Sequence, residues 1–189
     1  MKTVSFTRKI DGNTKPYEFL EKLEQEFAAE LPNRLMQTLG RLEHSLAGYQ
    51  VSRLEHSLQS ATRAYRDGRS SDYVAAALLH DIGDELAPFS RSETAASILR
   101  PFVEHDLYQI VQTHRVFQEF YYGEQTSLDR NARERFINEH WYNDAIEFCE
   151  KYDQNCFDPA YESEPLEFFQ PIVQEVFSRA PRFTAKNPV

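Results

Sequence analysis

Apolar residues recur along most of the chain at steps of three and four, the period of an amphipathic α-helix. No alternating run of strand length interrupts this pattern. Six helices are predicted before residue 123: from Pro16, from Pro32 to Gly48, from about Val51 to Gly68, from Ser70 to near Gly83, from Ser90 to Pro101, and from about Asp106 to Tyr122. The segments TSLDRNARERF, DAIEFCEKYD and PLEFFQPIVQEVF supply the later helices. The sequence therefore predicts an all-α fold in one domain.

Local signals define several of the predicted helix ends. Proline is favoured in the first turn of a helix, and glycine often follows the last turn. Ser70 and Ser71 are both good N-cap residues, and Ser90 with Glu93 has the spacing of a capping box. The run VAAALL, residues 74–79, is apolar on all sides, which predicts a central, buried helix.

The composition argues against several broad classes. Hydrophobic residues make up 41% of the 189 residues, enough for one domain with a substantial core. The formal net charge of −9, without a basic patch, argues against a surface for nucleic acid or acidic membranes. No apolar run approaches the roughly 18 residues of a membrane span, and the first residues lack a secretory signal. Because Cys149 and Cys156 match no zinc-site spacing, a reduced, cytoplasmic protein is expected.

The stretch ALLHDIGDEL, residues 77–86, places His80 and Asp81 directly after an apolar run. Both residue types are poor core fillers unless they are paired or bind a metal. An imidazole next to a carboxylate suits iron, manganese or zinc better than calcium or copper. The alternative is a capped helix end with a hydrogen-bonded histidine.

Three further polar residues fall on core-facing stripes of other predicted helices. They are His56, His114 and Asp153. Each on its own can be a hydrogen-bonded core residue. Together with His80 and Asp81 they come from four predicted helices and could converge on a metal. The sequence thus offers a candidate set of metal ligands.

The order His56, His80-Asp81, Asp153 resembles the H…HD…D ligand pattern of the HD-domain superfamily. The resemblance runs from about residue 39 to 177, which would form the HD core, with residues 1–38 as an N-terminal helical extension. The stretches VSRLEHSLQSA, AALLHDIG and PLEFFQPIV are most similar to the small HD oxygenases. These include phosphonate-cleaving oxygenases and, more distantly, myo-inositol oxygenase.

The resemblance implies a role for each candidate ligand. His56, His80 and Asp153 would hold a first iron, Asp81 would bridge two ions, and His114 would hold a second iron. Such a mixed-valent diiron centre uses O2 to oxidise a C–H bond of a small substrate. Manganese or another divalent metal is the alternative cofactor.

One expected ligand of the second iron is missing. Related oxygenases place a histidine where this chain has Arg91, and a guanidinium cation would repel a metal. His105 lies beyond Pro101, which is expected to be too far along the chain. Glu93 is an alternative ligand that nothing in the sequence requires. The first metal site is therefore expected to be complete, and the second damaged or altered.

The expected substrate pocket also departs from that of the phosphonate enzymes. Their histidine after HDIG corresponds to Asp84, their pocket lysine to Gln118, and an arginine near the last aspartate to Glu150. A phosphonate dianion needs cationic partners, so it is not expected to bind in that manner. Acidic residues among aromatic ones favour a small cation such as a quaternary ammonium group, unless those aromatic residues are simply core. Asp84, Gln118, Glu150 and Arg91 are the candidate substrate-binding residues.

The hexapeptide RLEHSL occurs twice, at residues 41–46 and 53–58, and raises a choice between His44 and His56. His56 has the neighbours that match the oxygenases and is the expected ligand. His44 and Tyr49 fall in a segment that related oxygenases use as a lid over the iron, so both are lid candidates. Tyr49 is accordingly a candidate catalytic residue, together with Asp81 and Asp84.

Three functions are compatible with this pattern. The leading one is a diiron-type oxygenase that oxidises a small polar metabolite with O2. The second is a metal-dependent phosphohydrolase, which needs only the H…HD…D site and in which Arg91 could clamp a phosphate. The third is a non-enzymatic binding or scaffold protein with one metal or none.

Overall fold

The computed structural model describes residues 3–183, and all regular secondary structure in that range is helical. The α-helices are α1 (Thr14–Ala29), α2 (Leu31–Arg41), α3 (Arg53–Arg66), α4 (Ser71–Leu79), α5 (Arg91–Leu99), α6 (His105–Thr126), α7 (Tyr142–Tyr152) and α8 (Gln170–Phe177). Short 3₁₀-helices are η1 (Lys9–Asp11), η2 (Leu42–His44), η3 (Ala132–Phe136) and η4 (Leu166–Phe169). The predicted all-α class is confirmed. Among the described residues, no helix is both long and apolar enough to cross a membrane.

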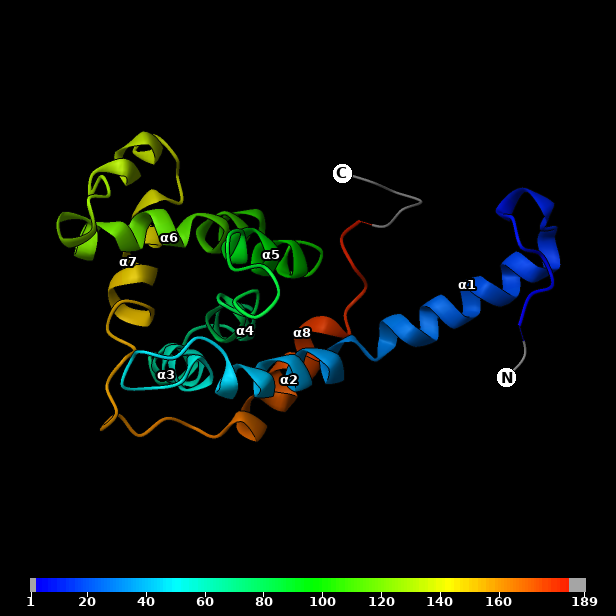
Figure 1. Ribbon diagram of the computed structural model, residues 1–189, viewed down its shortest axis with the longest axis horizontal. Helices are drawn as coiled ribbons and strands as arrows, with labels where there is room; N and C mark the ends of the chain where they lie inside the picture. The colour runs from blue at the N-terminus through cyan, green and yellow to red at the C-terminus, as the bar shows by residue number, and fades with distance from the viewer. Residues whose placement is uncertain (1–2, 184–189) are drawn as a thin grey trace.

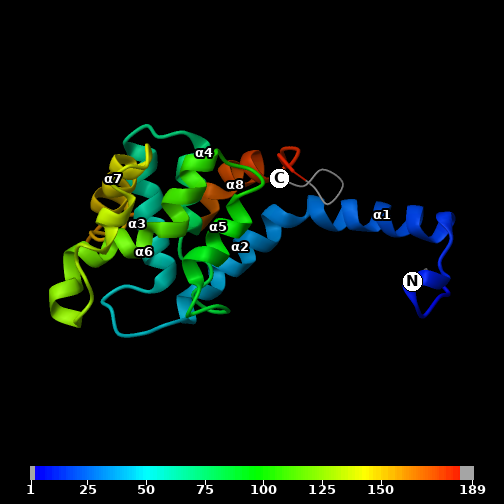
Figure 2. The same ribbon diagram turned by 90° about the horizontal axis from the view of Figure 1, so that it is seen from above.

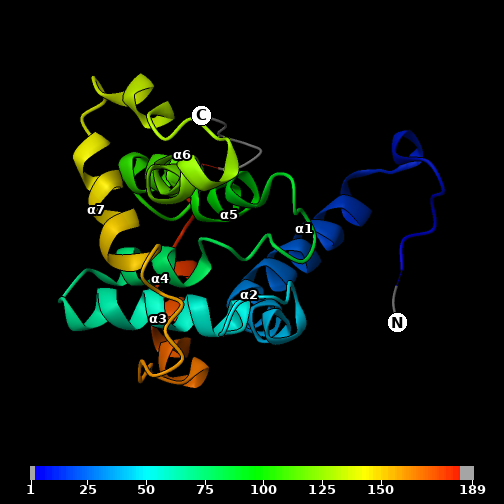
Figure 3. The same ribbon diagram turned by 60° about the vertical axis from the view of Figure 1, so that its left-hand side comes forward.

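The apolar helix α4 lies at the centre of the fold. Residues 74–79 are all buried, as their all-round apolar pattern predicts. Helices α3, α6 and α8 pack against α4, while α5 and α7 pack against α6 and α2 packs against α8. Figures 1 and 3 show α4 between a layer with α2 and α3 and a layer with α5 and α6. Residues at the end of α4 therefore face several helices at once.

Helix α1 projects away from the rest of the molecule. Figures 1 and 2 show it as an arm that leaves the body at the start of α2. Its apolar residues share one face at three- and four-residue steps, but none of the helix is buried, and Phe27 is 67% exposed. In α2, by contrast, Leu35 and Leu39 are buried. Of the extension expected over residues 1–38, only the part before α2 stands apart from the body.

Two helices end earlier than the sequence predicts. Helix α2 stops at Arg41 and continues only as the short η2. Helix α4 stops at Leu79, so that His80 is its C-cap. The turn that follows is pressed against the start of α5, because a Cβ on Gly83 would lie only 2.7 Å from the backbone oxygen of Arg91. The HDIG turn and Arg91 are thereby held side by side.

Two other expectations about helices fail in their local detail. Ser90 is the N-cap of α5, but its ψ of 36° is not extended and its side chain makes no capping hydrogen bond. The predicted capping box with Glu93 is therefore not formed. After Thr126, the last residue of α6, the stretch TSLDRNARERF contains η3, preceded by a turn in which the Asp129 carboxylate accepts the Asn131 backbone N–H. This side-chain bond competes with an α-helix at that point.

Replacing Ser70 with alanine is expected to lower the free energy of unfolding by about 1 kcal/mol. The Ser70 hydroxyl oxygen caps α4 by accepting the Tyr73 backbone N–H at 3.3 Å. Ser71 is instead the first residue of α4, and its hydroxyl donates to the exposed Glu175. Ser71→Ala is therefore the matched control, with an expected change within about 0.5 kcal/mol. Urea unfolding followed by circular dichroism measures both, and equal losses would contradict the capping role.

Candidate metal centre

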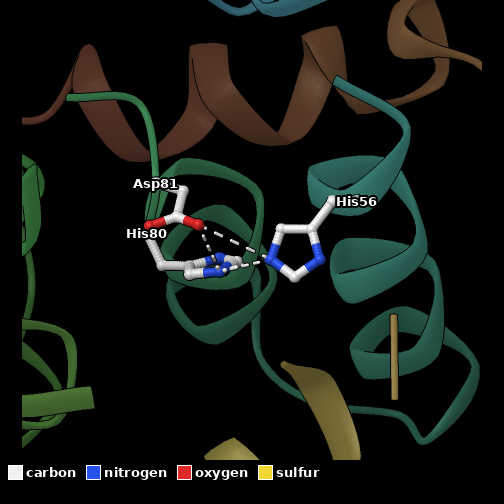
Figure 4. A group of neighbouring side chains, drawn as sticks. All are labelled: His56, His80 and Asp81. Carbon is white, nitrogen blue, oxygen red and sulfur yellow. Dashed lines mark hydrogen bonds and ion pairs between the residues drawn. The ribbon is translucent and has the colours of Figure 1, made fainter. Parts of the chain in front are cut away.

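Five polar side chains meet in the interior of the fold, around the end of α4. These residues, the central cluster, come from α3, the end of α4, α6 and the C-cap of α7: His56, His80, Asp81, His114 and Asp153. All five are buried. Two overlapping groups can hold a metal ion, one of His56, His80 and Asp81, the other of His80, His114 and Asp153. Figure 4 shows the first group, with the two imidazole rings pointing toward each other.

Backbone carbonyl groups fix the tautomer of each histidine in the cluster. The Nδ1 atom of His56 lies 3.0 Å from the Cys156 oxygen, and that of His80 lies 2.7 Å from the Ala77 oxygen. His114 makes the same contact one helical turn back, at 2.6 Å from the Val111 oxygen. A carbonyl oxygen only accepts hydrogen bonds, so each Nδ1 carries the proton. The Nε2 atoms then point into the cluster, as in metal-binding histidines.

The Nε2 atoms of His56 and His80 are 3.0 Å apart. If each ring carries a proton on Nδ1 alone, this contact brings together two lone pairs, which repel each other. A cation between them removes the repulsion, and ligands about 2.0–2.2 Å from a metal lie roughly 3 Å from one another. The separation therefore fits an ion bound by both histidines.

The carboxylates of Asp153 and Asp81 lie beside this pair of histidines. Asp153 Oδ1 lies 3.5 Å from His56 Nε2 and 3.8 Å from His80 Nε2. Asp81 Oδ2 lies 3.7 Å and 3.8 Å from the same two nitrogen atoms. Gln118 Nε2 donates to Asp153 Oδ1 at 2.7 Å and so orients that carboxylate. Asp81 Oδ1 and Asp153 Oδ2 are buried without a hydrogen bond in the described structure, as expected of oxygen atoms that serve a cation.

Burial and neighbouring charges set the protonation states in the cluster. Burial lowers the pKa of His80 to about 4, so its imidazole is neutral at neutral pH. Burial alone would raise the pKa of Asp81, but His80 and His114 hold that pKa well below its ordinary value. Burial opposes a charge on His114, yet Asp81 and Asp153 raise its pKa above the ordinary value. An ionised carboxylate beside a neutral His80 is the state that binds a divalent metal.

The other oxygen of Asp81 faces a different pair of side chains. Asp81 Oδ1 lies 3.6 Å from His114 Nε2 and 3.5 Å from Arg91 Nε. Arg91 therefore points toward the cluster, at the oxygen to which a second ion would bind. His105 is exposed at the start of α6, and Glu93 is exposed on α5. Neither takes the place of the missing histidine ligand.

A second, fully buried arginine lies beside the cluster. Arg53 Nε is 2.8 Å from Asp84 Oδ2, and Arg53 Nη1 is 3.6 Å from Asp81 Oδ2. Arg91 Nη1 donates to the other Asp84 oxygen at 2.7 Å, so two guanidinium groups flank one carboxylate. Sequence reasoning missed Arg53. The feature of the sequence that could have identified Arg53 is its position one helical turn before His56, at the start of the second RLEHSL copy.

The charges of this site favour an anion once a metal is present. The two guanidinium groups and the carboxylates of Asp81, Asp84 and Asp153 leave a formal charge of −1 when the histidines are neutral. One divalent ion turns this value into +1. In a buried site this surplus attracts a negatively charged ligand, because little water screens it.

The structure weakens the argument for the cationic substrate that was expected from the sequence. That expectation rested on acidic side chains at Asp84 and Glu150. Asp84 is buried and flanked by both guanidinium groups. Glu150 is exposed on α7, where it lines a surface hollow with Arg63 and Tyr161, apart from the central cluster. Of the four candidate substrate-binding residues, Gln118, Asp84 and Arg91 lie at the cluster.

The two lid candidates lie at different distances from the cluster. The Tyr49 ring stacks on Phe157 with a centroid distance of 4.7 Å, and Phe157 stacks on His56 at 4.4 Å. Tyr49 is thus separated from the nearest cluster ring by Phe157. It also lies beside the Arg53 guanidinium, 4.9 Å from the ring centroid. His44 is exposed, so the two RLEHSL copies place their histidines in opposite environments.

No protein-family model matches this sequence, and neither does any curated protein. The case for a metal ion at the central cluster therefore rests on the arrangement of its residues.

Proposed function

We propose that this protein is a metal-dependent phosphohydrolase of the HD type that uses one divalent ion. The observation that carries the proposal is the 3.0 Å contact between the Nε2 atoms of two histidines, His56 and His80, with two carboxylates beside them. The ligands occur in the chain as H…HD…D, which is the order that HD proteins use to bind a metal. The ligand order points to His56, His80, Asp81 and Asp153, and the ligand atoms of the first three lie within 4.8 Å of one another.

The position of Arg91 supports one ion rather than two. Its Nε atom lies 3.5 Å from Asp81 Oδ1, the oxygen that a second ion would need. A guanidinium group stays protonated at physiological pH and repels a metal ion. A hydrolase needs only one ion to activate water, so its chemistry tolerates this arginine.

The residues of the chain would orient and shield a bound ion. When bound, the ion would lower the pKa of a water ligand and polarise a phosphoryl oxygen. Gln118 holds the Asp153 carboxylate, and backbone carbonyl groups hold the rings of His56 and His80. Phe157 stacks on His56 and keeps water from that face of the ring.

A diiron-type oxygenase is the second candidate, because His114 also faces Asp81. His114 Nε2 lies 3.6 Å from Asp81 Oδ1, while Oδ2 faces His56 and His80. This carboxylate therefore has the geometry to bridge two ions. A second ion could bind only if Arg91 moved away from Asp81. Iron, O2 and a small polar metabolite would then be required, whereas manganese or another divalent metal suffices for the hydrolase.

Replacing Arg91 with histidine is expected to raise the metal content from about one ion per chain to about two. The change removes the repelling cation and adds a ligand opposite His114. Elemental analysis of protein from cells supplemented with iron and manganese measures the metal content. Arg41→His is the matched control, because Arg41 is an exposed arginine paired with Glu85, and its metal content should equal that of the native protein.

Activity is tested on the same native preparation. Phosphate release from at least one member of a panel of nucleotides and phosphomonoesters is the expected result. Two ions in the native protein together with O2 consumption would instead establish the oxygenase. Bound metal without either activity would point to a binding protein, and the absence of bound metal would overturn the proposal.

A further inference from the structure

The proposed function leaves a role for the two arginines beside the metal centre. We propose that Arg91 binds the phosphoryl group of the substrate, in the place where a second metal ion would otherwise bind, and that Arg53 and Asp84 position it. This inference rests on the proposed function. The two can fail separately, because binding of the metal ion and binding of the anion are measured independently.

Arg91 lies between the buried carboxylates and the surface. Its side chain is 17% exposed, whereas the side chains of Arg53, Asp81 and Asp84 are at most 5% exposed. A ligand that approaches the metal from this side therefore meets the guanidinium group before the carboxylates. This placement suits a residue that contacts substrate.

Arg91 retains the capacity to donate hydrogen bonds to such a ligand. Its Nη1 atom donates to Asp84 Oδ1 at 2.7 Å, which fixes the plane of the guanidinium group. Its buried Nε atom faces Asp81 Oδ1 at 3.5 Å, so among the described residues Nη1 is the guanidinium nitrogen that has a hydrogen-bond partner. A guanidinium group carries five N–H donors in a planar fork that matches phosphoryl oxygen atoms in pairs. The anchored group can therefore bind an oxyanion without reorganising.

Arg53 leaves the charge of Arg91 available. It lies 2.8 Å from Asp84 Oδ2, on the opposite side of that carboxylate from Arg91. One guanidinium group is thus sufficient to compensate Asp84. Asp81, the other carboxylate beside Arg91, would share its charge with the metal ion. With the ion bound, the site as a whole then carries one positive charge more than its carboxylates balance when the histidines are neutral.

The backbone also holds Arg91 in place. Arg91 is the first residue of α5, and the HDIG turn packs on it so closely that a Cβ on Gly83 would lie 2.7 Å from its oxygen and 2.9 Å from its Cα. The guanidinium group is therefore anchored at both ends, by its backbone and by Asp84. A pre-positioned cation adds binding energy because little side-chain freedom is lost when the anion binds.

A purely structural Arg91 would behave differently. It would serve only as a counter-ion of Asp81 and Asp84, and its loss would lower stability or weaken metal binding. It would have no separate effect on the affinity of the metal-loaded protein for an anion. The discriminating quantity is thus the affinity for inorganic phosphate at saturating metal, measured beside the affinity for the metal itself.

The experiment is a calorimetric titration of the full-length, Mn²⁺-loaded protein with inorganic phosphate. Arg91→Gln is expected to weaken phosphate binding about tenfold or more, and Arg91→Lys to give an intermediate loss. Arg41→Gln, at an exposed arginine, should stay within about twofold of the native value. The affinity for Mn²⁺ is expected to change by less than about threefold in Arg91→Gln, because the four metal ligands remain.

Equal phosphate affinities of Arg91→Gln and native protein would overturn the inference. The same conclusion follows if the native Mn²⁺-loaded protein binds no phosphate, and the metal-centre proposal would then survive. Failure of the native protein to bind Mn²⁺, iron or another divalent metal would remove the proposed function, and this inference with it. If Arg91→Gln does not fold, the phosphate affinity of Arg91→Lys tests the inference instead, since lysine keeps the charge but loses the planar fork.

Discussion

Replacing His56 with alanine is expected to reduce bound metal from about one ion per chain to below about a tenth of an ion. His56 supplies one of the two Nε2 atoms that lie 3.0 Å apart, and its ring is fully buried. The variant also removes the His56 Nδ1–H group that donates to the Cys156 carbonyl oxygen. Elemental analysis of the purified protein measures the loss.

The chain itself offers the matched control for this variant. His44 stands in the same hexapeptide, RLEHSL, but is exposed. His44→Ala is therefore expected to keep the native metal content. If both variants lost metal equally, or if His56→Ala retained it, the central cluster would not be the metal centre.

Replacing Phe148 with alanine is expected to lower the free energy of unfolding by about 3–5 kcal/mol. Phe148 is fully buried on α7, and its ring lies 5.8 Å from the His80 ring and 6.4 Å from the His114 ring. The substitution removes apolar contacts and leaves a cavity directly beside two residues of the central cluster. For a domain of this size the thermal midpoint should fall by roughly 10 °C.

Urea unfolding and thermal unfolding of the metal-free protein measure this loss without a contribution from ion binding. Phe89→Ala is the control, because Phe89 is 95% exposed and its truncation should change stability by less than about 0.5 kcal/mol. A loss below about 1 kcal/mol in Phe148→Ala would mean that the core closes around the missing ring, contrary to the packing described here.

Much of the fold and of the candidate metal centre follows from local sequence. Helical periodicity predicts where most helices lie, because the spacing of apolar residues needs no knowledge of their partners. The continuous apolar run of α4 predicts its central position for the same reason. His56, His80, Asp81, His114 and Asp153 are predictable as a group because buried ionisable residues need partners. Their convergence in the fold agrees with that expectation.

Features that depend on neighbours distant in the chain could not be predicted in this way. The apolar face of α1 has the pattern of a buried helix, yet the tertiary structure buries none of its residues. Whether Arg91 points inward depends on the packing of the Gly83 turn against α5. Arg53 and Asp84 are 31 positions apart and become partners only when α3 packs beside the end of α4.

The sequence by itself determined an all-α fold and a group of His and Asp residues that could hold a metal ion, since helical period and residue type are local properties. Only the tertiary structure decided which charge lies beside Asp81, at the place where a second metal ion would bind. There a guanidinium group faces Asp81, paired with Asp84, and Asp84 is in turn paired with Arg53. The balance of these charges depends on distances between three separate segments of chain, because electrostatic energy falls with separation and rises with burial.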